Sequence, residues 1–148
     1  MVGDLLKRKN FTVATAESCT GGLLASTLTD VDGASAYVAG GIVSYTNAIK
    51  ISVLHVDAET LKKFGAVSSE TAREMAANVR EIFSSTIGIS TTGVAGSSVE
   101  GKPVGTVFIA VDAENFSEVK EFHFDGTRTE IKAQSVDAAL KLLTEHLT

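Results

Sequence analysis

Cysteine, proline and tryptophan are scarce in this 148-residue sequence, which has one cysteine, one proline and no tryptophan. The single cysteine, Cys19, cannot form a disulfide within the chain, and the opening residues lack the apolar stretch of a secretory signal. No apolar run approaches the roughly 18 to 20 residues that a membrane-spanning helix needs. We therefore expect a cytoplasmic protein with no transmembrane segment and no membrane partner.

Positive charge is also in deficit, because 13 Lys and Arg residues stand against 18 Asp and Glu residues, for a formal net charge of −5. Sequence-independent binding to nucleic acid relies on clustered Lys and Arg, so we expect no nucleic-acid partner. A small anion such as a nucleotide remains compatible with this charge. A few backbone N–H groups and one or two cations bind such a ligand without changing the overall balance.

The bulk composition is that of a globular protein, with 44% hydrophobic and 21% charged residues. A chain of 148 residues has the commonest size of one domain and can bury most of the surface that its unfolded form exposes. We therefore predict a single domain that spans residues 1–148.

Hydrophobic periodicity predicts strands that alternate with helices, followed by a hairpin and a last helix. β-branched and apolar segments predict strands over residues 11–16, 37–45, 86–91, 104–111 and 119–124. Helical spacing predicts helices over residues 1–9, 47–54, 57–64, 68–82 and 129–146. One more helix should pass through Leu23 and Leu28 and end around Asp32-Gly33, with Ser18 or Thr20 as its cap. Crossovers combined with a hairpin predict an α/β protein of three α/β/α layers with a mixed central sheet.

Two Gly-rich turns follow predicted strands, and the first of them contains Ser18. A hydroxyl in a strand-to-helix turn faces outward, and the N–H groups of such a turn can hold an oxyanion or a phosphate. Ser18 is therefore a candidate nucleophile for acyl transfer. The alternative is that Ser18 and Thr20 only cap a helix while the glycines permit a tight turn.

A serine nucleophile needs a base, and the three histidines are poorly placed for a catalytic triad: His55, His123 and His146. A neutral lysine is the remaining candidate, and both Lys50 and Lys102 lie near Gly-rich turns. Taken alone, either lysine is also compatible with a solvated surface residue. Cys19 is expected to pack beneath the turn, and no spacing of His and Cys indicates a metal site.

Five motifs in this order resemble those of the CinA C-terminal domain family. They are residues 16–22 (AESCTGG), 41–50 (GIVSYTNAIK), 65–68 (GAVS), 92–96 (TGVAG) and 102–107 (KPVGTV). The resemblance implies a nicotinamide-nucleotide amidase, which hydrolyses the carboxamide of nicotinamide mononucleotide to nicotinate mononucleotide and ammonia. It also implies that the enzyme uses no metal and no cofactor, and that it forms a homo-oligomer, a dimer or larger.

The resemblance implies Ser18 as the nucleophile, Lys50 as the base and Tyr45 as a residue that orients the lysine or the substrate. The N–H groups of the first turn would hold the oxyanion, and the second turn with Arg128 would receive the phosphate and ribose. The residues expected to bind substrate are Thr20, Gly21, Gly22, Asn47, Thr92, Gly93, Ala95, Gly96 and Arg128.

The sequence departs from the family pattern at two places near these motifs. Residues 97–101 (SSVEG) replace a longer loop that usually contains proline and further glycines, and Ala48 stands where glutamate is common. These departures leave two alternatives open: a catalytically silent module that binds a nucleotide, or an amidase for another small amide.

Overall fold

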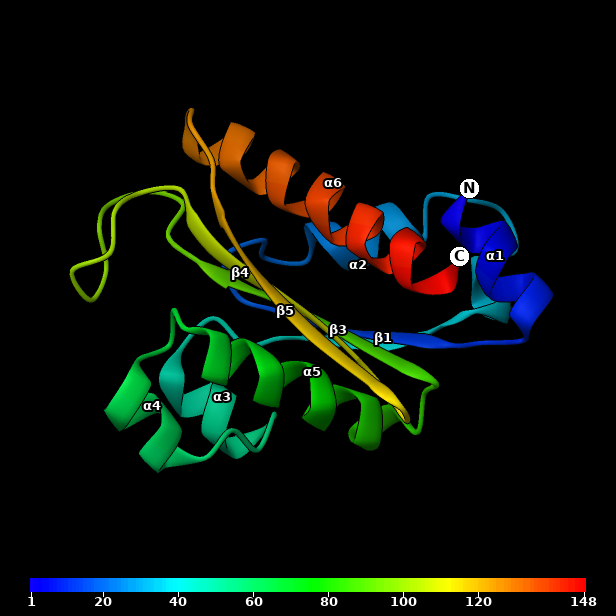
Figure 1. The fold of residues 1–148 in the computed structure, drawn as a ribbon, viewed down its shortest axis with the longest axis horizontal. Helices are drawn as coiled ribbons and strands as arrows, with labels where there is room; N and C mark the ends of the chain where they lie inside the picture. Colours follow the sequence, from blue (N-terminus) through cyan, green and yellow to red (C-terminus); the bar gives the residue numbers. More distant parts are fainter.

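The computed structural model describes all of residues 1–148 and contains a five-stranded sheet with the order β2-β1-β3-β4-β5 (Figure 1). β1 pairs in parallel with both β2 and β3, whereas β4 is antiparallel to both β3 and β5. The strands are β1 (Val13–Glu17), β2 (Val38–Val43), β3 (Ile87–Gly93), β4 (Thr106–Ala113) and β5 (Phe116–His123). The prediction of a mixed sheet is therefore confirmed.

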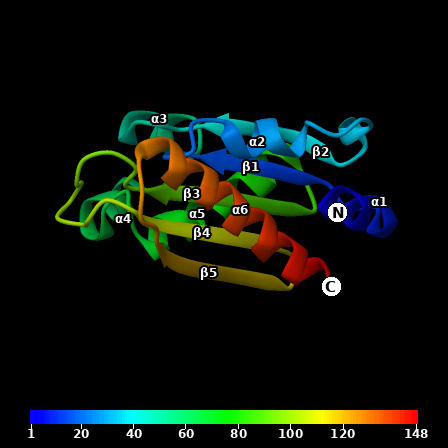
Figure 2. The same cartoon turned by 90° about the horizontal axis from the view of Figure 1, so that it is seen from above.

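Helices cover both faces of this sheet, as Figure 1 shows edge-on and Figure 2 shows from above. One face carries α1 (Val2–Lys9), α2 (Leu23–Leu28) and α6 (Arg128–Leu147). The other face carries α3 (Asn47–Ser52), α4 (Ala58–Phe64) and α5 (Ser69–Phe83). A short 3₁₀ turn (Ala34–Ala36) leads from the first layer into β2. The three α/β/α layers that the sequence predicts are present.

The central strands are buried because helices pack against both faces of the sheet. All of β1 is buried, and so is β3 up to Thr92. Small residues in these strands let α5 approach closely: any side chain in place of Gly88 would overlap the main chain of α5 at Ala76. One apolar core lies beneath α1, α2 and α6, and two smaller ones lie on the α5 side.

Several element boundaries differ from the sequence prediction by a few residues, and two of these differences bear on the argument. α2 ends at Leu28 rather than near Gly33, and its N-cap position is Gly22, which has φ +105° and no side chain to bond. Neither Ser18 nor Thr20 caps this helix. The hairpin is also tighter than predicted, because Asp112 still pairs with Ser117 and Ala113 with Phe116 across the β4–β5 ladder.

The parallel register of β1, β2 and β3 brings three chain segments together at one edge of the sheet. Glu17, the last residue of β1, lies opposite Val43 on one side and Thr91 on the other. The residues that follow each strand therefore emerge side by side, which is where open α/β sheets bind ligands.

No helix of the protein combines the length and the apolar character required to cross a membrane.

Candidate active site

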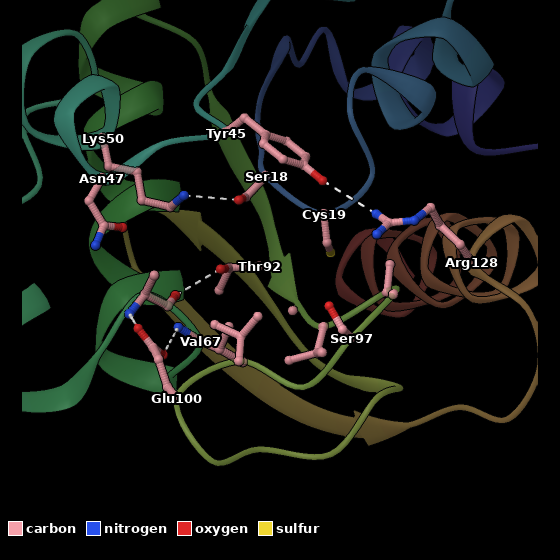
Figure 3. A pocket seen from close by; sticks show the side chains of 16 residues that line it. Ser18, Cys19, Tyr45, Asn47, Lys50, Val67, Thr92, Ser97, Glu100 and Arg128 are labelled. Atoms are coloured by element: carbon pink, nitrogen blue, oxygen red, sulfur yellow. Dashed lines mark hydrogen bonds between the residues drawn. The ribbon is translucent and has the colours of Figure 1, made fainter.

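A cavity of about 250 Å³ opens at this edge of the sheet. Its lining comes from the segments after β1, β2 and β3, from the loop that precedes α5 and from the start of α6 (Figure 3). The polar and charged residues of the lining include Ser18, Tyr45, Asn47, Lys50, Thr92, Glu100 and Arg128. The cavity thus unites the two Gly-rich turns and the strand end that the sequence singled out.

Ser18 and Lys50 are in direct contact at the floor of the cavity (Figure 3). The Lys50 Nζ lies 2.9 Å from the Ser18 Oγ and donates a second hydrogen bond of 2.7 Å to the carbonyl oxygen of Ser44. Lys50 is only 1% exposed and Ser18 9% exposed. The pair is therefore largely removed from water, with just enough access for the hydroxyl to meet a ligand.

Local structure fixes the position of Lys50. The Thr46 side chain caps α3 by accepting a hydrogen bond from the Ile49 N–H, and Lys50 lies one residue further along this short helix. Its amine contacts neutral oxygens, with no carboxylate in an ion pair. Burial lowers the pKa of Lys50 from 10.5 to about 8, while the charge of Glu100 acts weakly in the opposite direction. A substantial neutral fraction of this amine is present at mildly alkaline pH.

Cys19, the neighbour of Ser18, has the packing role that the sequence predicts. It is 6% exposed and belongs to the apolar core beneath α2 and α6. Burial raises the pKa of the Cys19 thiol to about 12, so the reactive thiolate is absent at neutral pH.

Glu17 is a residue of this site that sequence reasoning missed. Its carboxylate is 1% exposed and accepts hydrogen bonds from the Leu24 N–H (2.8 Å) and the Ala25 N–H (3.0 Å). Gly22 N–H contributes a third at 3.2 Å. Glu17 thus supplies the cap that α2 lacks. No signal in the sequence indicated this role, because Ser18 or Thr20 was the expected cap and Gly22 is identified as the N-cap position only by the structure.

Three residues that were expected to bind substrate do not line the cavity: Thr20, Gly21 and Gly22. The Thr20 side chain is fully buried, and its hydroxyl donates to Glu17 Oε1 at 2.6 Å and lies 2.7 Å from Thr91 Oγ1. Gly21 (φ +60°) and Gly22 (φ +105°) instead provide the left-handed backbone that reverses the chain into α2.

The other expected binding residues do line the cavity, at its wall and mouth: Asn47, Thr92, Gly93, Ala95, Gly96 and Arg128. Thr92 directs its hydroxyl to the carbonyl of Ala66 at 2.7 Å, which joins the second turn to the segment before α5. The N–H groups of Ala95 and Gly96 donate to no main-chain acceptor. This turn therefore presents free donors beside the cavity.

Arg128 and Tyr45 meet across the cavity mouth, where Arg128 Nη1 lies 3.4 Å from the Tyr45 hydroxyl (Figure 3). Tyr45 makes no hydrogen bond to Lys50; the carbonyl of the preceding residue, Ser44, holds the lysine instead. Arg128 has no acidic partner and is the first residue of α6, where a positive charge opposes the helix dipole. Its guanidinium also lies against Gly96, where any side chain would overlap it.

Glu100 ties the short loop after Gly96 to the opposite rim. Its two carboxylate oxygens accept hydrogen bonds from the Ala66 N–H (2.8 Å) and the Val67 N–H (3.0 Å). Residues 97–101, which depart from the family pattern in sequence, thus have a defined contact across the cavity. No group of three or more His, Cys, Asp and Glu side chains is arranged to hold a metal ion.

Comparison with known proteins identifies the family, because residues 1–147 match the CinA C-terminal domain. The chain belongs to the CinA C-terminal domain family. A CinA-like protein of Cytophaga hutchinsonii is 56% identical over 116 residues, and one of Syntrophomonas wolfei is 45% identical over 137 residues. These matches cover 77 and 91% of this chain but 28 and 33% of the two proteins. The CinA domain described here therefore spans about a third of the length of these curated relatives.

Crystal structures of the family share the fold of this CinA domain. A competence-damaged protein (CinA) superfamily protein from Klebsiella pneumoniae has a TM-score of 0.96 at 34% identity, covering 99% of this chain and 92% of that one. The competence/damage inducible protein CihA of Agrobacterium tumefaciens has a TM-score of 0.91 at 39% identity, covering 97 and 94% of the two chains.

The burial of Lys50 predicts a specific pH dependence for the stability of the CinA domain. Since the pKa of Lys50 is about 8 when folded and 10.5 when exposed, the unfolded chain binds more protons between these values. The free energy of unfolding of the wild type, relative to Lys50→Met, should therefore rise by up to about 3 kcal/mol over this range. Urea titrations at several pH values measure it.

The matched control for this experiment is Lys62→Met, which removes an exposed lysine of α4. Its difference from the wild type should stay constant with pH. A constant difference for Lys50→Met as well would show that the folded protein carries Lys50 without a lowered pKa.

Proposed function

We propose that this domain is a nicotinamide-nucleotide amidase that converts nicotinamide mononucleotide to nicotinate mononucleotide and ammonia. The observation that carries the proposal is the 2.9 Å contact between the Ser18 hydroxyl and the buried amine of Lys50 inside a cavity. A serine paired with a lysine of lowered pKa has the two functions that amide hydrolysis requires, a nucleophile and a base. Membership of the CinA C-terminal domain family supports the resemblance from which this activity is inferred.

In the first half of the reaction, Ser18 Oγ attacks the carboxamide carbon while neutral Lys50 takes the hydroxyl proton. The tetrahedral intermediate collapses as the C–N bond breaks, and Lys50 returns the proton to the departing ammonia. The product is an ester between Ser18 and the nicotinate carbonyl. A water molecule then attacks this ester, Lys50 removes its proton, and the same proton restores the Ser18 hydroxyl as the acid leaves.

The mouth of the cavity is suited to the phosphate and ribose of this substrate. Arg128 offers a guanidinium with no acidic partner, and the N–H groups of Ala95 and Gly96 are free of main-chain acceptors. A guanidinium and two amides are the donors that phosphate groups commonly recruit. In this proposal Asn47 contacts the substrate near Lys50, and Tyr45 orients Arg128 and the substrate rather than the lysine.

One observation favours a second candidate, an amidase for another small, less acidic amide, over a domain that binds a nucleotide without hydrolysing it. The Glu100 carboxylate occupies two N–H groups at the rim of the cavity and places a negative charge where an anionic substrate must enter. This charge opposes the phosphate of any nucleotide, whether or not the nucleotide is hydrolysed. The single-domain organisation, the cytoplasmic location and the homo-oligomeric state stay predictions from the sequence.

Turnover of nicotinamide mononucleotide is the direct test. The purified protein should release ammonia and nicotinate mononucleotide in equal amounts, and Ser18→Ala should lower kcat by at least about 10³-fold, because no nucleophile remains. Ser98→Ala, which removes an exposed hydroxyl outside the cavity, is the control and should retain full activity. Saturable binding of the nucleotide without ammonia release would favour the catalytically silent module. Ammonia release from other amides, but not from nicotinamide mononucleotide, would favour an amidase for another small amide.

The rate should follow the titration of Lys50. Because only the neutral amine accepts a proton, kcat/KM should rise about tenfold per pH unit below the midpoint and level off above pH 8. The charge of Glu100 raises the pKa of Lys50, so Glu100→Gln should shift the midpoint to lower pH. A wild-type rate that does not rise with pH up to 8, or a midpoint that moves upward in Glu100→Gln, would contradict the role of Lys50 as the base.

Arg128 should act on binding more than on chemistry. Arg128→Gln is expected to raise KM for nicotinamide mononucleotide by about 10- to 100-fold, the loss of one charge-assisted contact to phosphate. Nicotinamide riboside, which lacks the phosphate, should lose much less. Arg8→Gln on α1 is the control, at an exposed arginine that does not line the cavity. Equal losses for both substrates would place the phosphate elsewhere.

A further inference from the structure

The loop that joins β3 to β4 forms one wall of the cavity. Four of its residues belong to the lining: Gly96, Ser97, Val99 and Glu100. The two ends of the loop are joined by main-chain hydrogen bonds, from the Gly105 N–H to the Val94 carbonyl (2.7 Å) and from the Val94 N–H to the Thr106 carbonyl (2.8 Å). Residues 97–102, which lie between these joined ends, are called the strap below.

The strap has one polar attachment to the rest of the protein, the side chain of Glu100. Its carboxylate accepts hydrogen bonds from the N–H groups of Ala66 (2.8 Å) and Val67 (3.0 Å), which also line the cavity (Figure 3). The only other hydrogen bond of the strap is internal, from the Lys102 N–H to the Val99 carbonyl. No strap residue belongs to an apolar core or to an ion pair. The position of this cavity wall therefore depends on one side chain.

The segment that receives Glu100 is held in place by hydrogen bonds of its own. The Gly65 carbonyl accepts two hydroxyl hydrogen bonds, of 2.9 and 2.7 Å, from side chains at the start of α5. The Ala66 carbonyl accepts a third, of 2.7 Å, from the Thr92 hydroxyl. Because these carbonyls are fixed from behind, the N–H groups of the segment keep their direction whether or not Glu100 is in contact. The part that can move is the strap.

The closed position of the strap places Glu100 in an unfavourable backbone conformation. Glu100 has φ +55°, in the left-handed region that side chains other than glycine seldom adopt, and Gly101 follows with φ +76°. Gly65 lies beneath the carboxylate, where any side chain would overlap Glu100. Two hydrogen bonds at an exposed residue, where water competes for the carboxylate, thus oppose local backbone strain. Such a contact can open locally while the rest of the domain stays folded.

The cavity behind the closed strap is small for a nucleotide. Its volume of about 250 Å³ lies below the roughly 300 to 1,000 Å³ of sites that bury a small-molecule ligand. Nicotinamide mononucleotide carries a ribose and a phosphate in addition to its ring, so it needs more room than the closed cavity offers. Lifting the strap would enlarge the cavity on this side and remove the Glu100 carboxylate from its entrance.

We propose that the strap is an autoinhibitory element, which Glu100 holds closed across the cavity, and that a nucleotide binds only when Glu100 leaves the Ala66 and Val67 N–H groups. The closed strap and the ligand compete for the same space, so the observed dissociation constant exceeds that of the open form. Glu100 is a positioning residue in this role and touches no reacting atom. The inference rests on the proposed function for the identity of the nucleotide, whereas the opening of the strap does not depend on it.

Amide hydrogen exchange tests the opening of the strap without any ligand. Glu100→Asp keeps the charge and suits a left-handed backbone, but its side chain is one methylene too short for the contact. Exchange of the Ala66 and Val67 N–H groups should become at least about tenfold faster, while that of Val79 in the buried part of α5 keeps its rate. The matched control is Glu114→Asp, at an exposed residue outside the cavity, which should leave all three rates unchanged. Unchanged exchange at Ala66 and Val67 in Glu100→Asp would overturn the inference.

Ligand binding tests the competition. Nicotinate mononucleotide, the product of the proposed reaction, is the probe, because it binds without being consumed. Its Kd, measured by isothermal titration calorimetry, should fall in Glu100→Asp by about tenfold, the same factor by which exchange rises, since both report the open fraction. Glu114→Asp should bind as the wild type does. An unchanged or higher Kd in Glu100→Asp would show that the closed strap does not compete with the ligand, and would contradict autoinhibition.

The two proposals fail in distinguishable ways. Faster exchange in Glu100→Asp, in a protein that neither binds nicotinate mononucleotide nor releases ammonia from nicotinamide mononucleotide, would support the opening strap and remove the proposed substrate. Ammonia release with unchanged exchange would support the amidase and remove the strap.

Discussion

The site depends on one buried carboxylate, that of Glu17, at the junction between β1 and α2. Its oxygens accept the N–H groups that a short helix without a capping side chain would otherwise leave unpaired. A buried charge is tolerated only when it is fully hydrogen-bonded, and here donors surround it with no cation in contact. The turn that carries Ser18 is consequently held from beneath, and the strand end that carries Lys50 is held through Ser44.

Lys50 differs from Glu17, because it is a buried basic group with no acidic side chain to neutralise its charge. Its burial at 1% exposure lowers its pKa toward the range in which a lysine can act as a base. Such an amine destabilises the fold while it is charged, and proteins retain such groups mainly where chemistry requires them. The 2.9 Å contact therefore joins a buried amine of lowered pKa to the Ser18 hydroxyl.

Charged groups are distributed unevenly around the cavity, with different groups at its floor and at its mouth. Lys50 lies at the floor, Arg128 stands without an acidic partner at the mouth, and Glu100 ties the loop after Gly96 to Ala66 and Val67. The cavity lining therefore carries both a cation, Arg128, and an anion, Glu100. The overall charge of −5 conceals it, because a few local donors decide binding while distant acids do not.

The sequence by itself determined the α/β order, the mixed sheet and the segments that surround the cavity, since strand and helix periods and Gly-rich turns are local properties. It could not assign the cap of α2 to Glu17, because that bond depends on how β1 turns into the helix in space. The sequence also did not indicate that the Thr20 side chain points into the core. It did not indicate that Lys50 contacts the Ser44 carbonyl and not Tyr45. Tertiary structure decided these points, because hydrogen bonds between distant segments and the exclusion of water arise only when the strands lie side by side.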